Sequence, residues 1–492
     1  MTEPTITELA KQVGEIKTSA GDLGVAANIV WTLVTGFLVM FMQAGFALVE
    51  TGLCRKKNAA HVMSMNFLVY SIGILGFWSI GFALQMGGVG GMATFGGDAT
   101  LSNEFTINVA GHSFGLFGMN GFFLTFASFT PAVAAMFLFQ MVFMDTTATI
   151  PTGAMAERWK FLSFVIFSFV IATLIYPIYA NWVWGTGWLS SLGANFHLGH
   201  GHVDFAGSSV VHMTGGVAAL VGAKMLGPRI GKYNKDGSAN PIPGHNIPMA
   251  LLGTFILAFG WFGFNPGSTL AGTDTRIAVV AVNTMLASAS GAFAAGVYVW
   301  LRFGKPDPTW LANGMLAGLV AITAPCAFVG APSAILIGAI AGVLVVFSAM
   351  FIEQKLKIDD PVGASSVHGT CGTWGVLSLG LFANGSYGDG WNGVPGKVTG
   401  LFFGDASQFW AECIGIIVNV TYVGGMTAVA LFVINKLVGN RVSAEDEMAG
   451  LDIPEMGLPA YSDDAAHRGA MLEQLTHVVP ATTTPALEAN AE

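Results

Sequence analysis

The feature that most constrains the fold of this chain is a series of long apolar segments spread over most of its 492 residues. A helix needs roughly 20 mainly apolar residues to cross about 30 Å of hydrocarbon. We identify such segments at residues 29–53, 62–86, 121–150, 161–181, 207–227, 247–266, 276–301, 310–329, 332–352, 362–384 and 408–437. The sequence therefore predicts an all-α polytopic membrane protein with eleven transmembrane helices.

Composition agrees with a lipid environment and excludes other classes of protein. Charged residues make up only 10% of the chain, whereas soluble domains carry about a quarter. The net charge is −9 and no basic stripe is present, so we predict no nucleic-acid binding. No phosphate-binding loop, cofactor fingerprint or nucleophile–base set occurs, so we predict neither an enzyme nor a bound cofactor. The four cysteines lie in or beside apolar segments, and we predict no disulfide.

The distribution of basic residues predicts the orientation of the chain. With the N-terminus outside, fifteen lysines and arginines flank the spans on the inner side: Arg55, Lys56, Lys57, Arg158, Lys160, Lys224, Arg229, Lys232, Lys235, Arg302, Lys305, Lys355, Lys357, Lys436 and Arg441. After the first span, the outer loops hold only Arg276 and Lys397. Basic residues accumulate on the cytoplasmic side of membrane proteins. We therefore predict an N-out, C-in protein of the cell membrane.

Three regions follow from this topology. Residues 1–28 form a polar extracytoplasmic segment without the pattern of a signal peptide, in which Ile6, Leu9, Val13 and Ile16 share one face of a short helix. Residues 29–437 form the transmembrane domain. Residues 438–492 form a cytoplasmic tail, and we expect its part from residue 462 onward to be disordered.

An internal repeat centred on two histidines carries the functional prediction. Residues 204–216 read DFAGSSVVHMTGG and residues 360–372 read DPVGASSVHGTCG. The identical pairs are Asp204/Asp360, Gly207/Gly363, Ser209/Ser365, Val211/Val367, His212/His368, Thr214/Thr370 and Gly216/Gly372. The copies open spans five and ten, so they run in opposite directions through the membrane. This predicts a 5+5 inverted repeat, with the eleventh helix outside it.

Inverted-repeat transporters place their substrate sites near the midplane, at the interface of the repeats. His212 and His368 are therefore expected to meet in a pore. The alternative is that each histidine only hydrogen-bonds a neighbouring helix; the symmetric pair favours the pore. Asp204 and Asp360 each precede a span, as an N-terminal cap would, and we interpret them as structural.

Several segments resemble one known family. FQMVFMDTTATIPTGAMAER at 139–158, WFGFNPGS at 261–268, the two histidine segments and the tail RVSAEDEMAGLDIPEMGLPAY at 441–461 are similar to the Amt ammonium transporters of the Amt/Mep/Rh superfamily. The agreement runs from about residue 30 to residue 461, in the expected order and spacing. The resemblance implies a homotrimer with one pore in each subunit, and a PII-type signal protein as a possible partner at the cytoplasmic face.

The resemblance also implies roles for individual residues. Trp184, Phe143 and Ser268 would form an outer recruitment site for ammonium, and Phe143 and Phe264 a stacked gate beneath it. His212 and His368 would be the twin histidines of the lumen, and Trp261 would line the pore beside the second histidine.

Four features depart from the family pattern or stand apart from it. Gly363 occupies a position where the family often has an acid, and Met456 one where a polar residue is usual. Asp145, inside the third span, has no role that the resemblance supplies; it either bonds a neighbouring helix or carries protons. The three histidines of an outer loop have metal-like spacing but lack a fourth ligand, so we predict no metal site for His197, His200 and His202.

The chemistry of these residues suits ammonium. Aromatic faces attract a small cation by roughly 0.5–2 kcal/mol per contact. An apolar lumen makes a bare cation costly, so loss of its proton at the gate becomes favourable. We expect ammonium, with methylammonium as an analogue, to be recruited, deprotonated and conducted. The alternatives are a Rhesus-type neutral gas channel and an ammonium sensor that signals through its tail.

Overall fold

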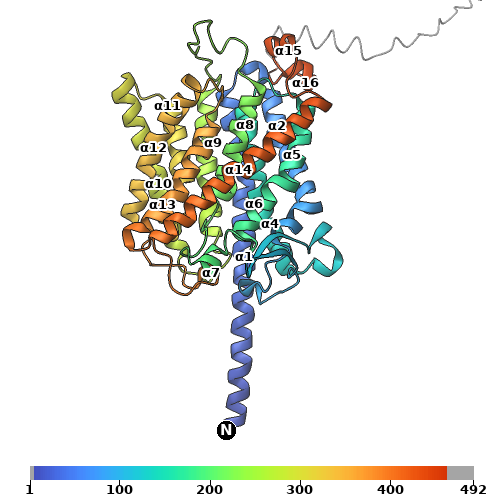
Figure 1. Ribbon diagram of the computed structural model, residues 1–492, viewed down its shortest axis with the longest axis vertical. Helices are drawn as coiled ribbons and strands as arrows, with labels where there is room; N and C mark the ends of the chain where they lie inside the picture. Colours follow the sequence, from blue (N-terminus) through green and yellow to red (C-terminus); the bar gives the residue numbers. More distant parts are fainter. Residues whose placement is uncertain (1–4, 462–492) are drawn as a thin grey trace, which may run out of the picture.

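The computed structural model describes residues 5–461, and most of them form helices that run roughly along one direction (Figure 1). Within these residues nine helical segments are long and apolar enough to cross a membrane. They are Ile6–Leu53, Lys56–Met86, Pro131–Met155, Phe161–Trp184, Ser208–Leu226, Ile247–Gly267, Ile277–Phe303, Ala331–Gln354 and Ala406–Leu437. The chain is thus a multi-pass membrane protein.

The other two predicted spans are also helical but shorter or interrupted. The segment at 310–329 becomes α11 (Pro308–Ile322), a shorter apolar helix that is mostly buried from Ala312 onward. The segment at 362–384 becomes a π-helical turn, η8 (Ser365–Thr370), continued by α13 (Cys371–Phe382). In α11 the buried residues lie between Ala312 and Ile322, and in α13 between Cys371 and Gly380.

The bounds of the other α-helices and π-helical turns are as follows. The long helices are α1 (Ile6–Leu53), α2 (Ala59–Gly76), α4 (Pro131–Met155), α5 (Phe161–Val170), α8 (Thr214–Leu226), α9 (Ile247–Gly267), α10 (Ile277–Phe303), α12 (Ala331–Gln354) and α14 (Ala406–Leu437). The short helices are α3 (Phe82–Met86), α6 (Tyr176–Trp184), α7 (Leu192–Phe196), α15 (Ala444–Ala449) and α16 (Asp452–Met456). Further π-helical turns are η2 (Phe77–Gly81), η6 (Ile171–Ile175) and η7 (Ser208–Met213).

Capping residues explain where several helices begin. Thr130 accepts a hydrogen bond from the backbone N–H of Val133, and Pro131 occupies the first turn of α4. Asp405 caps α14 in the same way. The predicted start of the third span at residue 121 is therefore wrong by ten residues. Residues 122–128 form two 3₁₀ turns, and Phe123 has a φ of 57°, which a continuous α-helix excludes.

The first helix is longer than predicted. Instead of a separate short helix before residue 29, α1 is one continuous helix of 48 residues. Its first half projects away from the bundle, which leaves Ile6, Leu9, Val13 and Ile16 exposed (Figure 1). The apolar face of that half therefore has no partner within the described part of the chain.

A β-hairpin lies between the second and third spans, where the sequence analysis expects only loop. Strands β1 (Glu104–Val109) and β2 (His112–Gly118) pair antiparallel. The two turn residues, Ala110 and Gly111, both have positive φ, as a type I′ turn requires. The hairpin covers the end of α6, because Trp182 donates a hydrogen bond to the Leu116 carbonyl oxygen at 2.9 Å.

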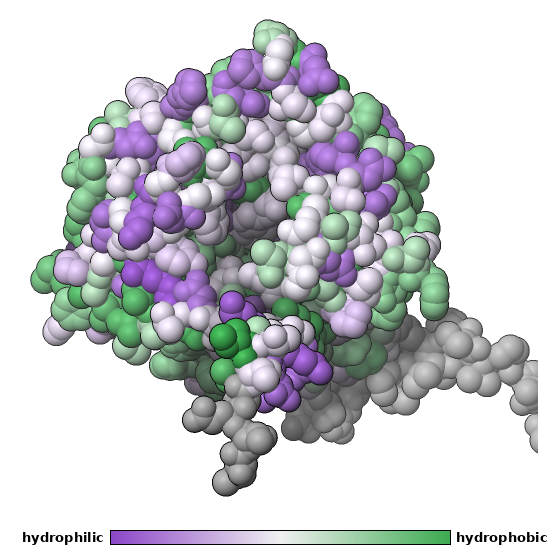
Figure 2. Space-filling model, turned by 90° about the horizontal axis from the view of Figure 1, so that it is seen from below, coloured by the Kyte–Doolittle hydropathy of each residue, from purple (hydrophilic) through white to green (hydrophobic). Residues whose placement is uncertain are grey.

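The two ends of the described chain lie at opposite ends of the bundle (Figure 1). We call them the N-terminal end and the tail end, the latter carrying α15 and α16. Figure 2 looks onto the N-terminal end, where hydrophilic and neutral residues surround a hollow and hydrophobic residues lie at the rim. At the tail end Glu455 accepts a hydrogen bond from the Phe161 backbone at 2.7 Å, so the tail packs on the bundle as far as residue 461. The tail segment predicted to be disordered lies outside the described residues.

Candidate functional site

The two repeated histidines lie side by side in the centre of the bundle. The Nδ1 atoms of His212 and His368 are 3.2 Å apart, and the rings are stacked with their centroids at 5.2 Å. His212 is fully buried and His368 is 4% exposed. Because Nδ1 faces Nδ1, one imidazole donates its N–H and the other accepts it. His212 Nε2 is buried and has no hydrogen-bond partner among residues 5–461. This nitrogen is available to a small guest molecule.

A carboxylate organises the chain just before the first histidine. Asp204 accepts hydrogen bonds from four consecutive backbone N–H groups, at 2.6–2.9 Å: those of Gly207, Ser208, Ser209 and Val210. These are the N–H groups that the first turn of a helix leaves without partners. The turn that follows is η7, a π-helix that contains His212. π-Helical turns are frequent at functional sites, because they displace a side chain from the regular helical face.

The second histidine has the same local structure. Asp360 accepts hydrogen bonds from the N–H groups of Gly363, Ala364 and Ser365 at 2.7–3.2 Å, and the π-helix η8 with His368 follows. Gly363, the position that departs from the family pattern, has a φ of +79°, and its counterpart Gly207 has +116°. The backbone turn therefore requires glycine at this position in both copies.

Glycines also bring the two histidine segments into contact. A Cβ atom on Gly216 would lie 2.0 Å from the Gly369 nitrogen, and one on Gly372 would lie 2.6 Å from the Ser208 carbonyl oxygen. Only a residue without a side chain allows two helices to approach this closely. The close crossing holds the two imidazoles within hydrogen-bonding distance.

A stack of aromatic rings closes the space on one side of the histidines. The rings of Phe143 and Phe264 are stacked with centroids 4.1 Å apart, and both are fully buried or nearly so. The Phe264 ring also stacks on His212 at 5.3 Å. The Phe264 ring thus lies between the Phe143 ring and the His212 ring.

Trp261 contacts a different histidine from the one that the resemblance implies. The resemblance placed it beside the second histidine, but its ring stacks on His212, the first one, at 5.1 Å. Trp261 and Phe264 are three residues apart on α9 and therefore share a helix face, which lies against His212. The indole N–H donates to the Thr323 hydroxyl at 3.0 Å and fixes the ring.

The expected recruitment residues lie next to the phenyl stack. Trp184 contacts the edge of Phe143, with ring centroids 5.9 Å apart, and is held by a 2.6 Å hydrogen bond from its indole N–H to the Asp204 carbonyl oxygen. The Ser268 hydroxyl donates to the Phe264 carbonyl oxygen at 2.8 Å, which leaves its own lone pairs free to accept. Trp184 and Ser268 thus each contact one of the two stacked phenylalanines, Trp184 through the Phe143 ring and Ser268 through the Phe264 backbone.

A small cavity lies on the other side of the histidines and contains a residue that the sequence analysis missed. The space open to water centres is about 20 Å³, and its lining includes Phe46, Glu50, Asn313, Val362 and His368. Asn313 and Val362 also line a wide cavity of about 470 Å³ at the tail end. The signal for Glu50 was a carboxyl group within an apolar segment, which is a functional candidate by default.

His200 and His202, two of the three histidines predicted to lie in an outer loop, have hydrogen-bonding partners within the protein. His200 Nε2 lies 3.0 Å from the Gly396 carbonyl oxygen, and His202 Nδ1 lies 2.6 Å from the carboxylate of Glu412. Burial lowers the pKa of His202, but the charge and hydrogen bond of Glu412, together with the charge of Asp204, outweigh burial and raise that pKa above its ordinary value. His202 Nε2 contacts the Ser209 hydroxyl at 2.9 Å, which in turn donates to Asp204. No sequence pattern indicates this pair, because Glu412 lies in a span far along the chain.

Asp145 lies apart from the histidines. It is buried between α4 and α2, near Gly73, and its Oδ1 has no hydrogen-bond partner within residues 5–461. It does not line the cavity beside His368.

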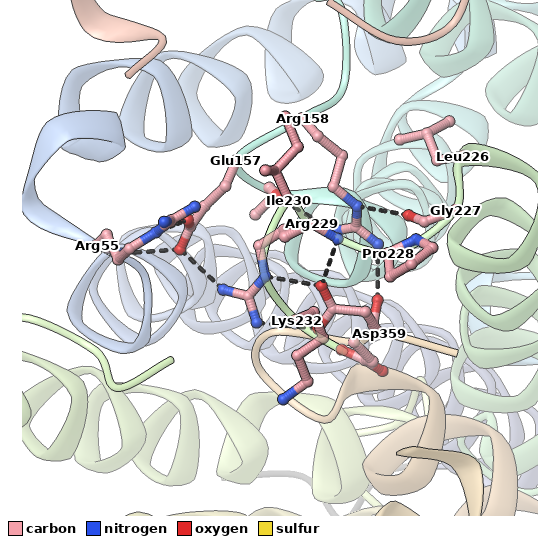
Figure 3. A network of polar contacts seen from close by, with 12 residues as sticks. Arg55, Glu157, Arg158, Leu226, Gly227, Pro228, Arg229, Ile230, Lys232 and Asp359 are labelled. Atoms are coloured by element: carbon pink, nitrogen blue, oxygen red, sulfur yellow. Dashed lines mark hydrogen bonds and ion pairs between the residues drawn. The ribbon is translucent and has the colours of Figure 1, made fainter. Parts of the chain in front are cut away.

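Arg55 and Arg229, two of the basic residues predicted to lie on the inner side, form part of an ion-pair network at the tail end (Figure 3). The Arg229 guanidinium donates to both carboxylate oxygens of Asp359 at 2.8 and 3.0 Å and to Glu157 at 3.0 Å. Arg55 also pairs with Glu157. Burial alone would raise the pKa of Asp359, but its hydrogen bonds and charge interaction with Arg229 hold that pKa well below its ordinary value. The network ties the loops after α1, α4, α8 and α12 together.

Comparison with known proteins places the chain among transporters. The model of the Ammonium Transporter Family matches residues 30–461. The chain is 46% identical to the ammonium transporter Amt2 of Archaeoglobus fulgidus over 436 residues, which is 88% of each protein, and 37% identical to Amt1 of Haloferax mediterranei over 90% of this chain and 80% of that one. Among solved structures, one titled Sensor Amt Protein superposes with a TM-score of 0.76 at 36% identity, covering 88% of this chain and 99% of that one. Candida albicans Mep2 gives 0.71 at 26% identity, covering 86% and 87%.

Proposed function

The chain belongs to the ammonium transporter family and carries ammonium across a membrane, and from this premise we propose that the path runs past the phenyl stack and the two histidines. The observation that carries the proposal is the 3.2 Å approach of His212 to His368 directly behind the Phe143–Phe264 stack. A hydrated cation cannot pass stacked rings, whereas a small neutral molecule needs only a transient shift of one ring.

Recruitment takes place on the outer side of that stack. The faces of Trp184 and Phe143 attract the cation, and the Ser268 hydroxyl accepts one of its N–H groups. No carboxylate is required, and this matters because a tightly held ion would leave slowly. Potassium is attracted by the same rings but has no proton to donate to Ser268 or to release.

Beyond the gate the permeant is ammonia. Transfer of a charged ion into a buried aromatic lumen costs far more than transfer of a neutral amine, so the ion releases its proton at the gate. Ammonia then passes beside the imidazoles. The free Nε2 of His212 accepts the released proton, and the hydrogen bond between the two Nδ1 atoms gives that proton a route to His368. Transport of ammonia and proton together is equivalent to net transport of ammonium and moves charge.

The resemblance and the positions of the elements support a fuller arrangement. The protein has eleven transmembrane helices with N-out, C-in orientation in the cell membrane, of which ten form a 5+5 inverted repeat. The opposite locations of the two chain ends and the matching Asp–Gly–π-helix–His structures support this arrangement (Figure 1). Asp204 and Asp360 act structurally, as caps. The protein assembles as a homotrimer with a pore in each subunit, and its tail end offers a docking surface to a PII-type signal protein.

The experiment that tests this function is a current measurement on proteoliposomes containing the purified protein. An ammonium concentration step should evoke a current, and radiolabelled methylammonium should accumulate inside. Uptake of ammonia without current would instead identify a neutral gas channel of the Rhesus type. A sensor is the second candidate, because one similar structure is titled Sensor Amt Protein. Ammonium binding without either flux or current would favour the sensor.

A further inference from the structure

We infer that Glu50 is the protonation site at the tail-side mouth of the lumen, where its carboxyl group returns the proton to ammonia as ammonia leaves. The inference rests on the proposed function, since it assumes that ammonia and proton pass the gate separately. Four observations on the described residues support it: position, hydrogen bonding, charge environment and the adjoining cavities.

The position of Glu50 follows from helical geometry. Phe46 and Glu50 are four residues apart on α1 and therefore point to the same side of that helix, about one turn from each other. The Phe46 ring lies 6.1 Å from the His368 ring, centroid to centroid. Glu50 thus lies beyond Phe46 on the same face, toward the end of α1 at Leu53, and lines the cavity that His368 lines.

The hydrogen bonds of Glu50 suit a carboxyl group that gains and loses a proton. Asn66 donates to Oε2 at 2.7 Å, and the Thr152 hydroxyl lies 2.9 and 2.7 Å from the two carboxyl oxygens. The same hydroxyl lies 2.6 Å from the Thr149 carbonyl oxygen. Thr152 can therefore donate to an ionised Glu50, or turn toward Thr149 and accept from a protonated Glu50. Both protonation states keep a complete set of hydrogen bonds.

No positive charge fixes Glu50 in its ionised form. The carboxyl group is 3% exposed and has no ion-pair partner in the chain between residues 5 and 461. The other titratable groups that interact with it are Asp360 and Cys54, and His368 lines the same cavity. The Asp360 carboxylate is occupied by three backbone N–H groups and holds the turn before His368. Among the described residues, Glu50 is the only one with a carboxyl group in the lining of the small cavity, and Asp360 lines the wide cavity instead.

The two cavities provide the route that we propose for the proton from His368 to Glu50 and for ammonium toward the tail end. A water molecule needs about 10–15 Å³ and two or more polar partners, and the cavity between His368 and Glu50 offers about 20 Å³ with Asn313 as a third polar group. One water therefore fits between the imidazole and the carboxyl group. Asn313 and Val362 line both this cavity and the 470 Å³ cavity, so the two spaces adjoin, and the larger one has room for a hydrated ion.

The proposed step is a simple proton exchange. A proton passes from His368 through the water to the Glu50 carboxylate, which becomes a neutral carboxylic acid. Ammonia then takes that proton: its lone pair forms a new N–H bond, the carboxyl O–H bond breaks, and ammonium and carboxylate result. The ammonium ion moves into the wide cavity, and Glu50 is ready for the next proton. No other reactant is needed.

The test compares Glu50→Gln with wild type in two assays on the same proteoliposomes. Glutamine has the same shape and accepts the Asn66 hydrogen bond, but it cannot carry a proton. We expect the ammonium-evoked current to fall at least about tenfold. Entry of ammonia, measured with a pH-sensitive dye inside the vesicles, should stay within about twofold of wild type. Loss of both readouts would show that Glu50 only shapes the lumen and would overturn the inference.

Two further variants complete the design. Asp145→Asn makes the same change at a buried carboxyl group outside the cavity and should keep most of its current. If both variants lose current equally, the position of Glu50 is not the cause and the inference fails. Glu50→Asp keeps a titratable group but withdraws it by one methylene, so its current should fall severalfold with unchanged ammonia entry; this variant serves if Glu50→Gln does not fold. Full current in it or in Glu50→Gln would overturn the inference.

The same currents separate the role of Glu50 from the proposed function. A wild-type protein that gives no ammonium-evoked current contradicts the proposed function, and the role of Glu50 with it. Full current in Glu50→Gln together with lost current in His212→Ala contradicts only the role of Glu50.

Discussion

His212 and His368 face each other through the same ring nitrogen, Nδ1, at 3.2 Å, although 156 residues separate them in the sequence. A hydrogen bond between like nitrogens requires the two imidazoles to differ, because only one of them carries the shared proton. When a proton arrives at one Nε2, the shared proton can shift and the other Nε2 can release one. The pair therefore passes a charge along without either ring moving.

Removal of the Ser268 hydroxyl should weaken the binding of ammonium at the proposed recruitment site. In Ser268→Ala, ammonium loses one acceptor, and a hydrogen bond to a charged group contributes about 1.5–3 kcal/mol. We expect the ammonium concentration for half-maximal current to rise at least about tenfold with little change in maximal current. Concentration series of proteoliposome currents measure both. A lower maximal current at unchanged half-saturation would place Ser268 in the translocation step instead.

The carboxylate of Asp204 should matter for folding more than for chemistry. It accepts four backbone N–H groups in a buried turn, and an amide oxygen in Asp204→Asn cannot satisfy all of them. Buried donors without partners cost about 1–3 kcal/mol each. We expect a melting temperature in detergent several degrees lower than that of wild type. Asp360→Asn, which leaves three donors, is the matched comparison and should show a similar loss. An unchanged melting temperature in both variants would contradict the capping role.

For Glu104, at the start of β1, we predict a contribution to stability that falls as the pH rises. Burial raises its pKa to about 7, despite a hydrogen bond from Asn181. Because the pKa in the folded state lies above the ordinary value of 4.5, the folded protein loses stability between about pH 4.5 and pH 7, as the carboxyl group ionises. Glu104→Gln should therefore melt on the order of 2 °C higher than wild type at pH 8 and equally at pH 4.5. Thermal unfolding of both proteins across this pH range measures the difference. A pH-independent difference would refute the assignment.

For Asp359 we predict the opposite pH dependence, a contribution to stability that falls as the pH falls. Arg229 holds the pKa of Asp359 below its ordinary value, so the pair stabilises the folded state above about pH 4, and this stabilisation is lost as the pH falls further. Asp359→Asn should lower the melting temperature at pH 7 by several degrees, because a buried arginine loses part of its partner. The difference should shrink on acidification below pH 4. Asp389→Asn, at an exposed position, is the control and should melt like wild type.

The sequence predicted those parts of the fold that rest on local pattern. Apolar length located the spans, although the start of α4 was placed too early because residues 121–130 are as apolar as the helix and only Thr130 and Pro131 mark its beginning. The hairpin and the outward extension of α1 escaped prediction. The turn formed by Ala110 and Gly111 is a weak signal, and nothing in the polar residues before 29 marks an end to helix.

The site was predictable where the sequence repeats and unpredictable where the fold alone brings residues together. The repeat pointed to both histidines and both aspartates. The location of Trp261 against His212, the pairing of His202 with Glu412 and the position of Glu50 beside His368 depend on how three or more helices pack. Such packing leaves no periodic signal in one sequence. The only signal for Glu50 in the sequence is that it is an acidic residue within an apolar span.

The most direct measurement compares current and ammonia entry in His212→Ala and wild-type proteoliposomes, with His368→Ala as the symmetric variant. If the paired imidazoles carry the proton, both variants lose the ammonium-evoked current while ammonia still enters, because alanine widens the lumen but transfers no proton. Full current in His212→Ala would contradict this account.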